Sequence, residues 1–290
     1  MELEISAGAA IEAELQALHG HARQRAVTEH VLAVADQAGY GAALIHPVAR
    51  GGAEDSVITW LQFAHLVRTA ARGLSRRGLQ EGDTAGIFVE DAVSHVVAVH
   101  AVRAAGAIAV PVRPARSAAE VGVQLKERRA RLLITSAGLA DLAIQAAERS
   151  LVRQVFSFGE AEGTTEFGSL LQTSRHGQLE ANGNAHGVGP APEKVFDLSG
   201  LGPDEPVPQL IRRPVPRLTC RDVVVAAPPC GDPEAYTSLL DLALTVGATI
   251  VAAPLAQITA AVGVYKGTAA IVPRGTDVPG LPAGRVLAVG

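Results

Sequence analysis

The chain has 290 residues, of which 48% are apolar and only 3% aromatic, and its formal net charge is −4. This length suits one large α/β domain or two smaller ones with a core of Ala, Val and Leu. The acidic balance, without a basic run, excludes nucleic acid as a partner, and no apolar run reaches the ~18–20 residues that a membrane span needs.

The N-terminal part predicts two helices, a strand and a turn. Ile11–Leu18 has a short helical pattern, and the acidic start of the chain differs from the basic start of a signal peptide, so we expect a cytoplasmic protein. The polar stretch that follows is predicted to be a solvated helix end. Its His19 and His21 are two residues apart and do not share a helix face, so a metal site is the weaker alternative. The next expected elements are a helix, a strand and a Gly-rich turn, at Val27–Ala38, Ala42–His46 and Pro47–Asp55.

The stretch from Ile58 to Pro114 predicts one compact unit. Thr59 is a plausible N-cap of an amphipathic helix, which Gly78 ends in the left-handed conformation. Strand, helix and strand follow, at Thr84–Val89, Asp91–Gly106 and Ala107–Val112. Such a unit is a βαβ crossover, in which the two strands lie parallel and the helix covers one face of the sheet.

Regular elements continue to about residue 158. Ser117 and Glu120 predict a capping box for a helix at Ala118–Arg129. The elements after it are a strand, a helix and a strand, at Arg131–Thr135, Leu139–Arg149 and Val152–Phe156. The segment Gly159–Cys220 is rich in Gly and Pro, which favour neither helix nor central strand, and only Glu166–Gln172 within it is expected to be ordered.

Regular structure is expected again in the last third of the chain. Six elements are predicted, at Asp222–Ala227, Pro233–Val246, Ala248–Ala252, Leu255–Val262, Thr268–Val272 and Arg285–Val289. We therefore divide the chain into an N-terminal α/β subdomain (1–158), an irregular connector (159–221) and a second α/β segment (222–290). Cys220 and Cys230 fit no common zinc motif and indicate a reducing compartment.

Three motifs in order carry a resemblance to a known family. They are T-W-x-x-F at Thr59–Phe63, L-x-x-x-G-L-x-x-G-D at Leu74–Asp83 and G-A-I-A-V-P-V at Gly106–Val112. The combination resembles the N-terminal portion of the adenylate-forming, 4-coumarate–CoA ligase-like acyl- and aryl-CoA ligases. The resemblance implies an α/β fold with layered, mostly parallel sheets and flanking helices. The family's later half, with its adenine-binding motifs and catalytic Lys, would lie beyond Gly290.

The resemblance also shows which nucleotide-binding parts are missing. The ligases hold ATP in a Ser/Thr/Gly-rich loop with a following Lys, and residues 157–221 contain no such run. The nearest string, Glu162–Glu166, has flanking carboxylates and no Lys, so we expect a surface turn rather than a phosphate loop. We expect Lys266 at the surface.

One turn gives the only candidate binding residues. Where the ligases usually carry His, this chain has Asp232, so Pro229 and Asp232 are our candidates for substrate contact. Asp232 also suits the N-cap of the helix that begins at Pro233, which is the simpler interpretation. No motif for a nucleophile or a metal site is present, so no catalytic or metal-ligating residue is assigned. We expect His65, His95 and His100 on core helices, with His100 as a satisfied core histidine rather than a base.

Two functional hypotheses follow from these residues. The first is a ligase-like binding or accessory protein without adenylation activity and without a cofactor, with an acyl or aryl small molecule as a possible ligand. The alternative is an active or split AMP-forming ligase that uses ATP with Mg²⁺ and CoA to activate a carboxylic acid. In either case apolar surface that a complete ligase buries would be exposed, so we expect a homo-oligomer or a partner protein that covers this face.

Overall fold

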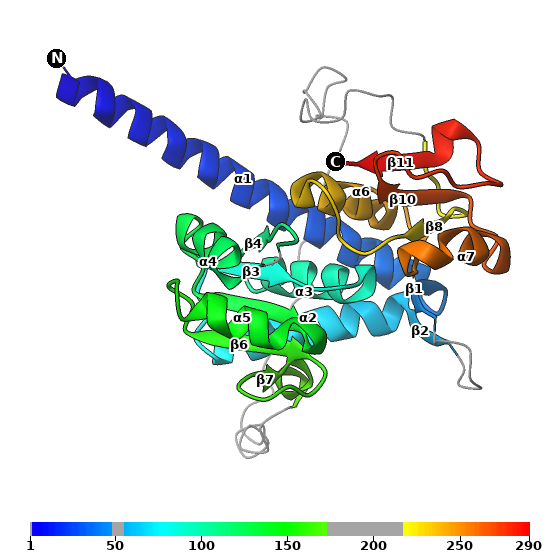
Figure 1. The fold of residues 1–290 in the computed structure, drawn as a ribbon, viewed down its shortest axis with the longest axis horizontal. Coiled ribbons are helices and arrows are strands. Elements are labelled where there is room, and N and C mark those ends of the chain that lie inside the picture. Colours follow the sequence, from blue (N-terminus) through cyan, green and yellow to red (C-terminus); the bar gives the residue numbers. More distant parts are fainter. Residues whose placement is uncertain (1, 48–54, 116, 173–216) are drawn as a thin grey trace, which may run out of the picture.

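Two β-sheets, with helices between and outside them, make up the structure (Figure 1). The computed structural model describes residues 2–47, 55–115, 117–172 and 217–290, with side chains from residue 20 onward. In sheet order, the six-stranded sheet contains β11 (Val286–Val289), β10 (Ala269–Pro273), β8 (Val223–Ala226), β9 (Thr249–Ala252), β1 (Ala42–His46) and β2 (Ser56–Thr59). The five-stranded sheet contains β4 (Ile108–Pro111), β3 (Thr84–Phe88), β5 (Leu132–Ser136), β6 (Gln154–Phe158) and β7 (Thr165–Glu166). Every strand pair is parallel except β1–β2, so the expected α/β class with mostly parallel sheets is confirmed.

The helices form three layers around the two sheets (Figure 1). A shared core joins the inner faces of both sheets to the middle layer, which is made of α1 (Glu2–Ala38), α2 (Trp60–Arg76), α3 (Ala92–Ala104) and α6 (Pro233–Thr245). A second core lies under α7 (Ile258–Val264) on the outer face of the six-stranded sheet. A third lies under α4 (Ala118–Glu127) and α5 (Ala140–Ala147) on the outer face of the other sheet. Parallel strands buried on both faces need this covering, which explains the Val- and Ala-rich composition.

The central unit forms as the sequence predicts. Thr59 caps α2 in a full capping box: its N–H donates to Gln62 Oε1 at 2.8 Å and its Oγ1 accepts from Gln62 N–H at 3.3 Å. Gly78 has the expected positive φ of 93°. Strands β3 and β4 pair in parallel and are joined by α3, so the βαβ crossover is confirmed.

The N-terminal helix differs from the expectation. The polar stretch predicted to be a solvated helix end lies inside one continuous helix, α1. His21 Nε2 lies 2.9 Å from the carbonyl oxygen of Gly106, and Arg25 pairs with Glu29 and Glu81. These polar side chains therefore contact the rest of the protein instead of marking a helix end, and the prediction was wrong because their partners lie far away in the sequence.

Several boundaries also move. The hairpin strand β2 was missed because it has only four residues, none of them fully buried. The helix expected at Leu139–Arg149 is α5, preceded by a 3-10 helix at Ala137–Leu139. A second 3-10 helix, Phe167–Leu171, occupies the part of the Gly/Pro-rich segment that was expected to be ordered. Residues 173–216 of that segment, and residues 48–54 of the Gly-rich turn, lie outside the described residues.

The two sheets do not separate along the chain at a single point. Strands β1 and β2 precede the five-stranded sheet in sequence, yet they belong to the six-stranded sheet, where β1 pairs with β9. As predicted, His65, His95 and His100 lie on the middle-layer helices α2 and α3; His95 and His100 are buried, and His65 is exposed. Lys266 is exposed, as predicted. Within the described parts of the chain, no helix is both long and apolar enough to cross a membrane.

Candidate functional site

The turn between β8 and α6 carries both residues predicted to contact a substrate. Asp232 Oδ1 accepts hydrogen bonds from the N–H groups of Glu234 at 2.9 Å and Ala235 at 3.3 Å, so the N-cap role is confirmed. Pro229 is half-buried in the same turn. Gly231 packs tightly against the end of β11, because a Cβ there would lie 2.6 Å from Gly290 Cα. A ligand-binding role for Pro229 and Asp232 stays a prediction.

The first turn of α3 begins at the same end of the molecule. Helices α3 and α6 run in the same direction, since His95 contacts Thr237 near their starts and Arg103 contacts Asp241 further along. Asp91 Oδ1 caps α3 by accepting from Ser94 N–H at 2.8 Å. Each helix N-terminus is thus capped by a carboxylate, which takes up part of the amide donors and places negative charge where a phosphate would otherwise be attracted.

The groups around this turn are held by protein contacts. Tyr236 is fully buried and its hydroxyl donates to the carbonyl oxygen of Ala227 at 2.7 Å. Burial raises the pKa of Tyr236 well above its usual value, and the nearby Cys230 and Asp91 add to this shift. Burial also raises the pKa of the half-buried Cys230 thiol, which makes it a poor nucleophile at neutral pH. Among the described residues, no group of three or more His, Cys, Asp or Glu is placed to hold a metal ion.

The first three residues of the string Glu162–Glu166 form a turn, as predicted, whereas Thr165 and Glu166 form strand β7. Gly163 has a φ of 74°, and Thr164 Oγ1 donates to the carbonyl oxygen of Ala161 at 2.8 Å. The same hydroxyl lies 2.6 Å from Ser157 Oγ. These hydroxyls satisfy each other and the backbone, so the turn offers little to a phosphate.

A buried polar layer, which the sequence analysis missed, joins α1, α3 and α6. Arg103 Nη1 donates to both carboxylate oxygens of Asp241, at 3.1 and 2.8 Å. His100 Nε2 lies 3.4 Å from Asp241 Oδ1, and its Nδ1 lies 2.9 Å from Thr28 Oγ1. The one available signal was the presence of the charged residues Arg103 and Asp241 in helices that are mostly apolar.

The protonation of this layer follows from burial. Burial lowers the pKa of His95 to about 3, and the charge of Arg103 contributes to the same shift. Burial, aided by Arg103, also lowers the pKa of His100 well below its ordinary value. Burial raises the pKa of Asp241, while Arg103 opposes that shift. Both histidines are therefore neutral at pH 7, and His100 is a satisfied core residue, as predicted.

Comparisons with known proteins agree with this architecture. The family model described as AMP-binding enzyme matches residues 34–195. The 4-coumarate–CoA ligase 2 of Solanum tuberosum is 28% identical over 130 residues, which are 45% of this chain and 24% of that protein. The 4-coumarate–CoA ligase 1 of Petroselinum crispum is 34% identical over 90 residues, which are 31% of this chain and 16% of that protein. The matches thus cover only part of these relatives.

Solved structures share the fold. A long-chain-fatty-acid–CoA ligase (FadD1) from Archaeoglobus fulgidus superposes with a TM-score of 0.62 at 18% identity, over 85% of this chain and 51% of that chain. A benzoate CoA ligase from Burkholderia xenovorans LB400 superposes with a TM-score of 0.61 at 19% identity, over 90% of this chain and 54% of that chain. The chain therefore spans about half the length of these two structures. The resemblance stated from the motifs is confirmed.

Proposed function

Because this chain belongs to the AMP-binding enzyme family, we propose that it is an acyl- or aryl-CoA ligase-like protein that binds without adenylating. In this proposal the chain acts as a binding or accessory protein for an acyl or aryl group, with Pro229 and Asp232 beside the ligand. It needs no ATP, Mg²⁺ or CoA. Its free cysteines, Cys220 and Cys230, favour a reducing, cytoplasmic location.

The carboxylate caps of α3 and α6 are the observation that carries the proposal. Adenylation develops negative charge on the transferring phosphoryl group, and enzymes stabilise that charge with oriented donors and cations. Here Asp91 and Asp232 place negative charge at both helix N-termini and occupy one N–H group of α3 and two of α6. The sequence of residues 157–221 supplies no Gly-Lys pair to offset them.

ATP–pyrophosphate exchange tests the proposal directly. The purified chain is assayed with Mg²⁺ and a panel of benzoic, cinnamic and fatty acids, with the Solanum tuberosum 4-coumarate–CoA ligase 2 as the positive control. We expect no exchange above the background without acid, because phosphate charge would not be neutralised. Acid-dependent exchange above background, altered by Asp232→Ala, would establish the alternative, an active ligase that uses ATP and CoA.

The proposal also predicts that the chain binds one or more acids of the same panel. Such binding is measured as a rise in the unfolding temperature. A ligand that binds only the folded state raises the unfolding temperature in proportion to the logarithm of its concentration.

We also propose that the chain associates with a second copy or a partner protein. Strand β11, at one edge of the six-stranded sheet, supports this, because an unpaired edge can accept another strand.

A further inference from the structure

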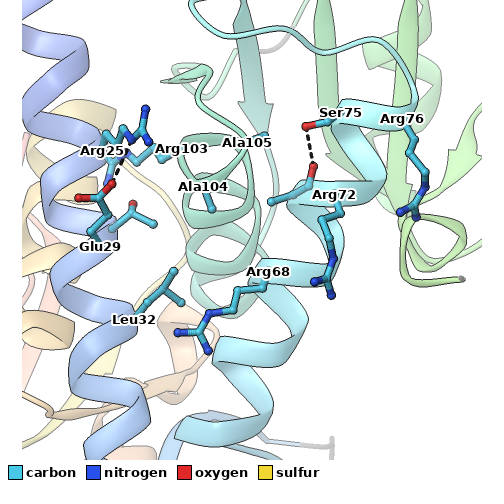
Figure 2. A pocket seen from close by; sticks show the side chains of 12 residues that line it. Arg25, Glu29, Leu32, Arg68, Arg72, Ser75, Arg76, Arg103, Ala104 and Ala105 are labelled. Carbon is cyan, nitrogen blue, oxygen red and sulfur yellow. Dashed lines mark hydrogen bonds and ion pairs between the residues drawn. The ribbon is translucent and has the colours of Figure 1, made fainter. Parts of the chain in front are cut away.

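A cavity of about 660 Å³ opens between α1, α2 and the C-terminal end of α3 (Figure 2). Its volume lies in the range of small-molecule binding sites. Asp91 caps the opposite end of α3, and a helix of 13 residues is roughly 20 Å long. The cavity is therefore separate from the turn that carries Pro229 and Asp232.

Arginines dominate the lining, and we call the cavity the arginine groove. Five of them, Arg25, Arg68, Arg72, Arg76 and Arg103, line it together with one carboxylate, Glu29. Three already hold carboxylates: Arg25 pairs with Glu29 and Glu81, Arg68 with Asp36 in a two-pronged contact, and Arg103 with Asp241. The hydrogen bonds from Arg68 are strong enough to lower the pKa of Asp36.

Arg72 and Arg76 have no carboxylate partner among the described residues. Arg72 Nη2 donates to Thr69 Oγ1 at 3.2 Å, and Arg76 Nη2 makes long contacts with the carbonyl oxygens of Leu170 and Gln172, at 3.4 and 3.3 Å. Figure 2 shows them on successive turns of α2, after Arg68, with Arg68 reaching toward α1. Like charges four residues apart on a helix repel each other, so an anion between them would stabilise the folded state.

Arg103 gives a further indication that the groove binds an anion. Its side chain is 6% exposed, and its Nε is a buried donor without an acceptor in the described structure. Buried donors without a partner are rare and costly. The groove thus contains one buried donor without an acceptor, besides two arginines without a carboxylate partner in the described structure.

We propose that the arginine groove binds a small molecule that carries two phosphate groups, with Arg72 and Arg76 as its principal contacts. The planar guanidinium group binds phosphate through two parallel hydrogen bonds, and a phosphate group carries more negative charge than a single carboxylate, which suits two neighbouring arginines. Leu32, Ala71 and Ala104 give the groove an apolar wall on which the organic part of such a molecule packs. The inference does not depend on the proposed function.

Inorganic pyrophosphate is the probe for this proposal, with binding measured by calorimetry at low ionic strength. The groove variant Arg72→Gln/Arg76→Gln is compared with Arg149→Gln/Arg153→Gln, which removes the same charge from exposed positions outside the groove. We expect the groove variant to bind about 100-fold more weakly, at about tenfold for each lost contact, and the control to stay within twofold of the native chain. Thermal unfolding of both variants confirms that they fold, since Arg72 and Arg76 hold no ion pair in the described structure.

Hydrogen exchange identifies the place of binding. Bound pyrophosphate should slow the exchange of amides in the last turns of α2 and α3, while those at Asp91 and Asp232 stay unchanged. Three results would each overturn the proposal: no binding at millimolar pyrophosphate, an equal loss in both double variants, or tighter binding of a hexaglutamate peptide than of pyrophosphate. ATP–pyrophosphate exchange reports on the other end of α3, so the two proposals fail separately.

Discussion

His95 is a fully buried imidazole, and its environment makes the folded state sensitive to acid. Its Nε2 donates to Thr237 Oγ1 at 2.8 Å, and that hydroxyl in turn donates to the carbonyl oxygen of Pro233. The ring also packs edge-on against Tyr236. Because burial removes the water that would solvate a charged ring, the neutral form is strongly favoured, consistent with a pKa of about 3.

The pH dependence of stability follows from this shift. An unfolded histidine has a pKa of about 6.5, so between pH 6.5 and 3 the unfolded state binds a proton that folded His95 does not. The contribution is fully present above pH 6.5 and is lost as the pH falls toward 3. His100 acts in the same direction. Asp241, whose pKa is raised, acts in the opposite direction, since its contribution is present at low pH and lost as the pH rises.

We therefore predict that His95→Gln reduces the slope of unfolding free energy against pH. The amide keeps a hydrogen bond to Thr237 but does not titrate, so the slope between pH 6 and 5 should fall by up to about 1.4 kcal/mol per pH unit. Urea unfolding at a series of pH values measures it. The exposed His65→Gln is the matched control and should leave the slope as it is. An unchanged slope in His95→Gln would show that His95 protonates equally in both states.

At the scale of the elements, two helical glycines differ in what surrounds them. Gly73 of α2 faces the 3-10 helix at Phe167–Leu171, and a Cβ there would lie 2.4 Å from the carbonyl oxygen of Leu170. Gly263 of α7 has no atom within 4 Å of such a Cβ. Glycine destabilises a helix by about 1 kcal/mol relative to alanine. Close contact with a neighbouring element explains the glycine at position 73 but not the one at position 263.

Alanine substitutions should therefore shift stability in opposite directions. Gly263→Ala should stabilise the protein by about 0.5–1 kcal/mol through helix propensity. Gly73→Ala should destabilise it by about 1–2 kcal/mol, because overpacking against backbone outweighs the same gain. The urea midpoint measures both. A stabilised Gly73→Ala protein would mean that residues 167–171 do not pack on α2 in solution.

The sequence predicts an element well where its own residues decide the outcome. Strand β1, with its short apolar run, is predicted to the residue, and Thr59, Asp91 and Asp232 are caps because their neighbours in sequence supply the N–H groups. The sequence does not predict features that depend on contacts with residues distant in sequence. The polar part of α1 continues as helix because Gly106 and Glu81 receive its side chains, and the arginine groove exists only once three helices have met.

At the scale of the whole molecule, the middle helices tie the two sheets into one body (Figure 1). Arg103 comes from the helix that joins β3 to β4, and Asp241 from the helix that joins β8 to β9. A buried pair of this kind is costly to break from one side, by about 3–5 kcal/mol, because the remaining charge keeps no partner. The pair therefore fixes how the two sheets are placed more than it adds net stability.

The edges of the sheets remain the places where another chain can add. Strand β11 pairs with β10 on one side, and no described strand lies on its other side. Its side chains alternate in exposure, with Leu287 and Val289 buried and Ala288 exposed. The strand carries no charged side chain or proline, so its shortness is the only one of these common devices against edge-to-edge pairing that its sequence supplies.

We predict that the purified chain self-associates through this edge. Light scattering over a range of concentrations should show a mass that rises above that of one chain, because two β11 edges can pair. Ala288→Lys should return the mass to that of the monomer, since a charged edge residue opposes pairing. Ala260→Lys adds the same charge at an exposed position of α7 and should not change association. A native chain that stays monomeric at several hundred micromolar would contradict pairing through β11, and an equal effect of both lysines would assign the association to net charge instead.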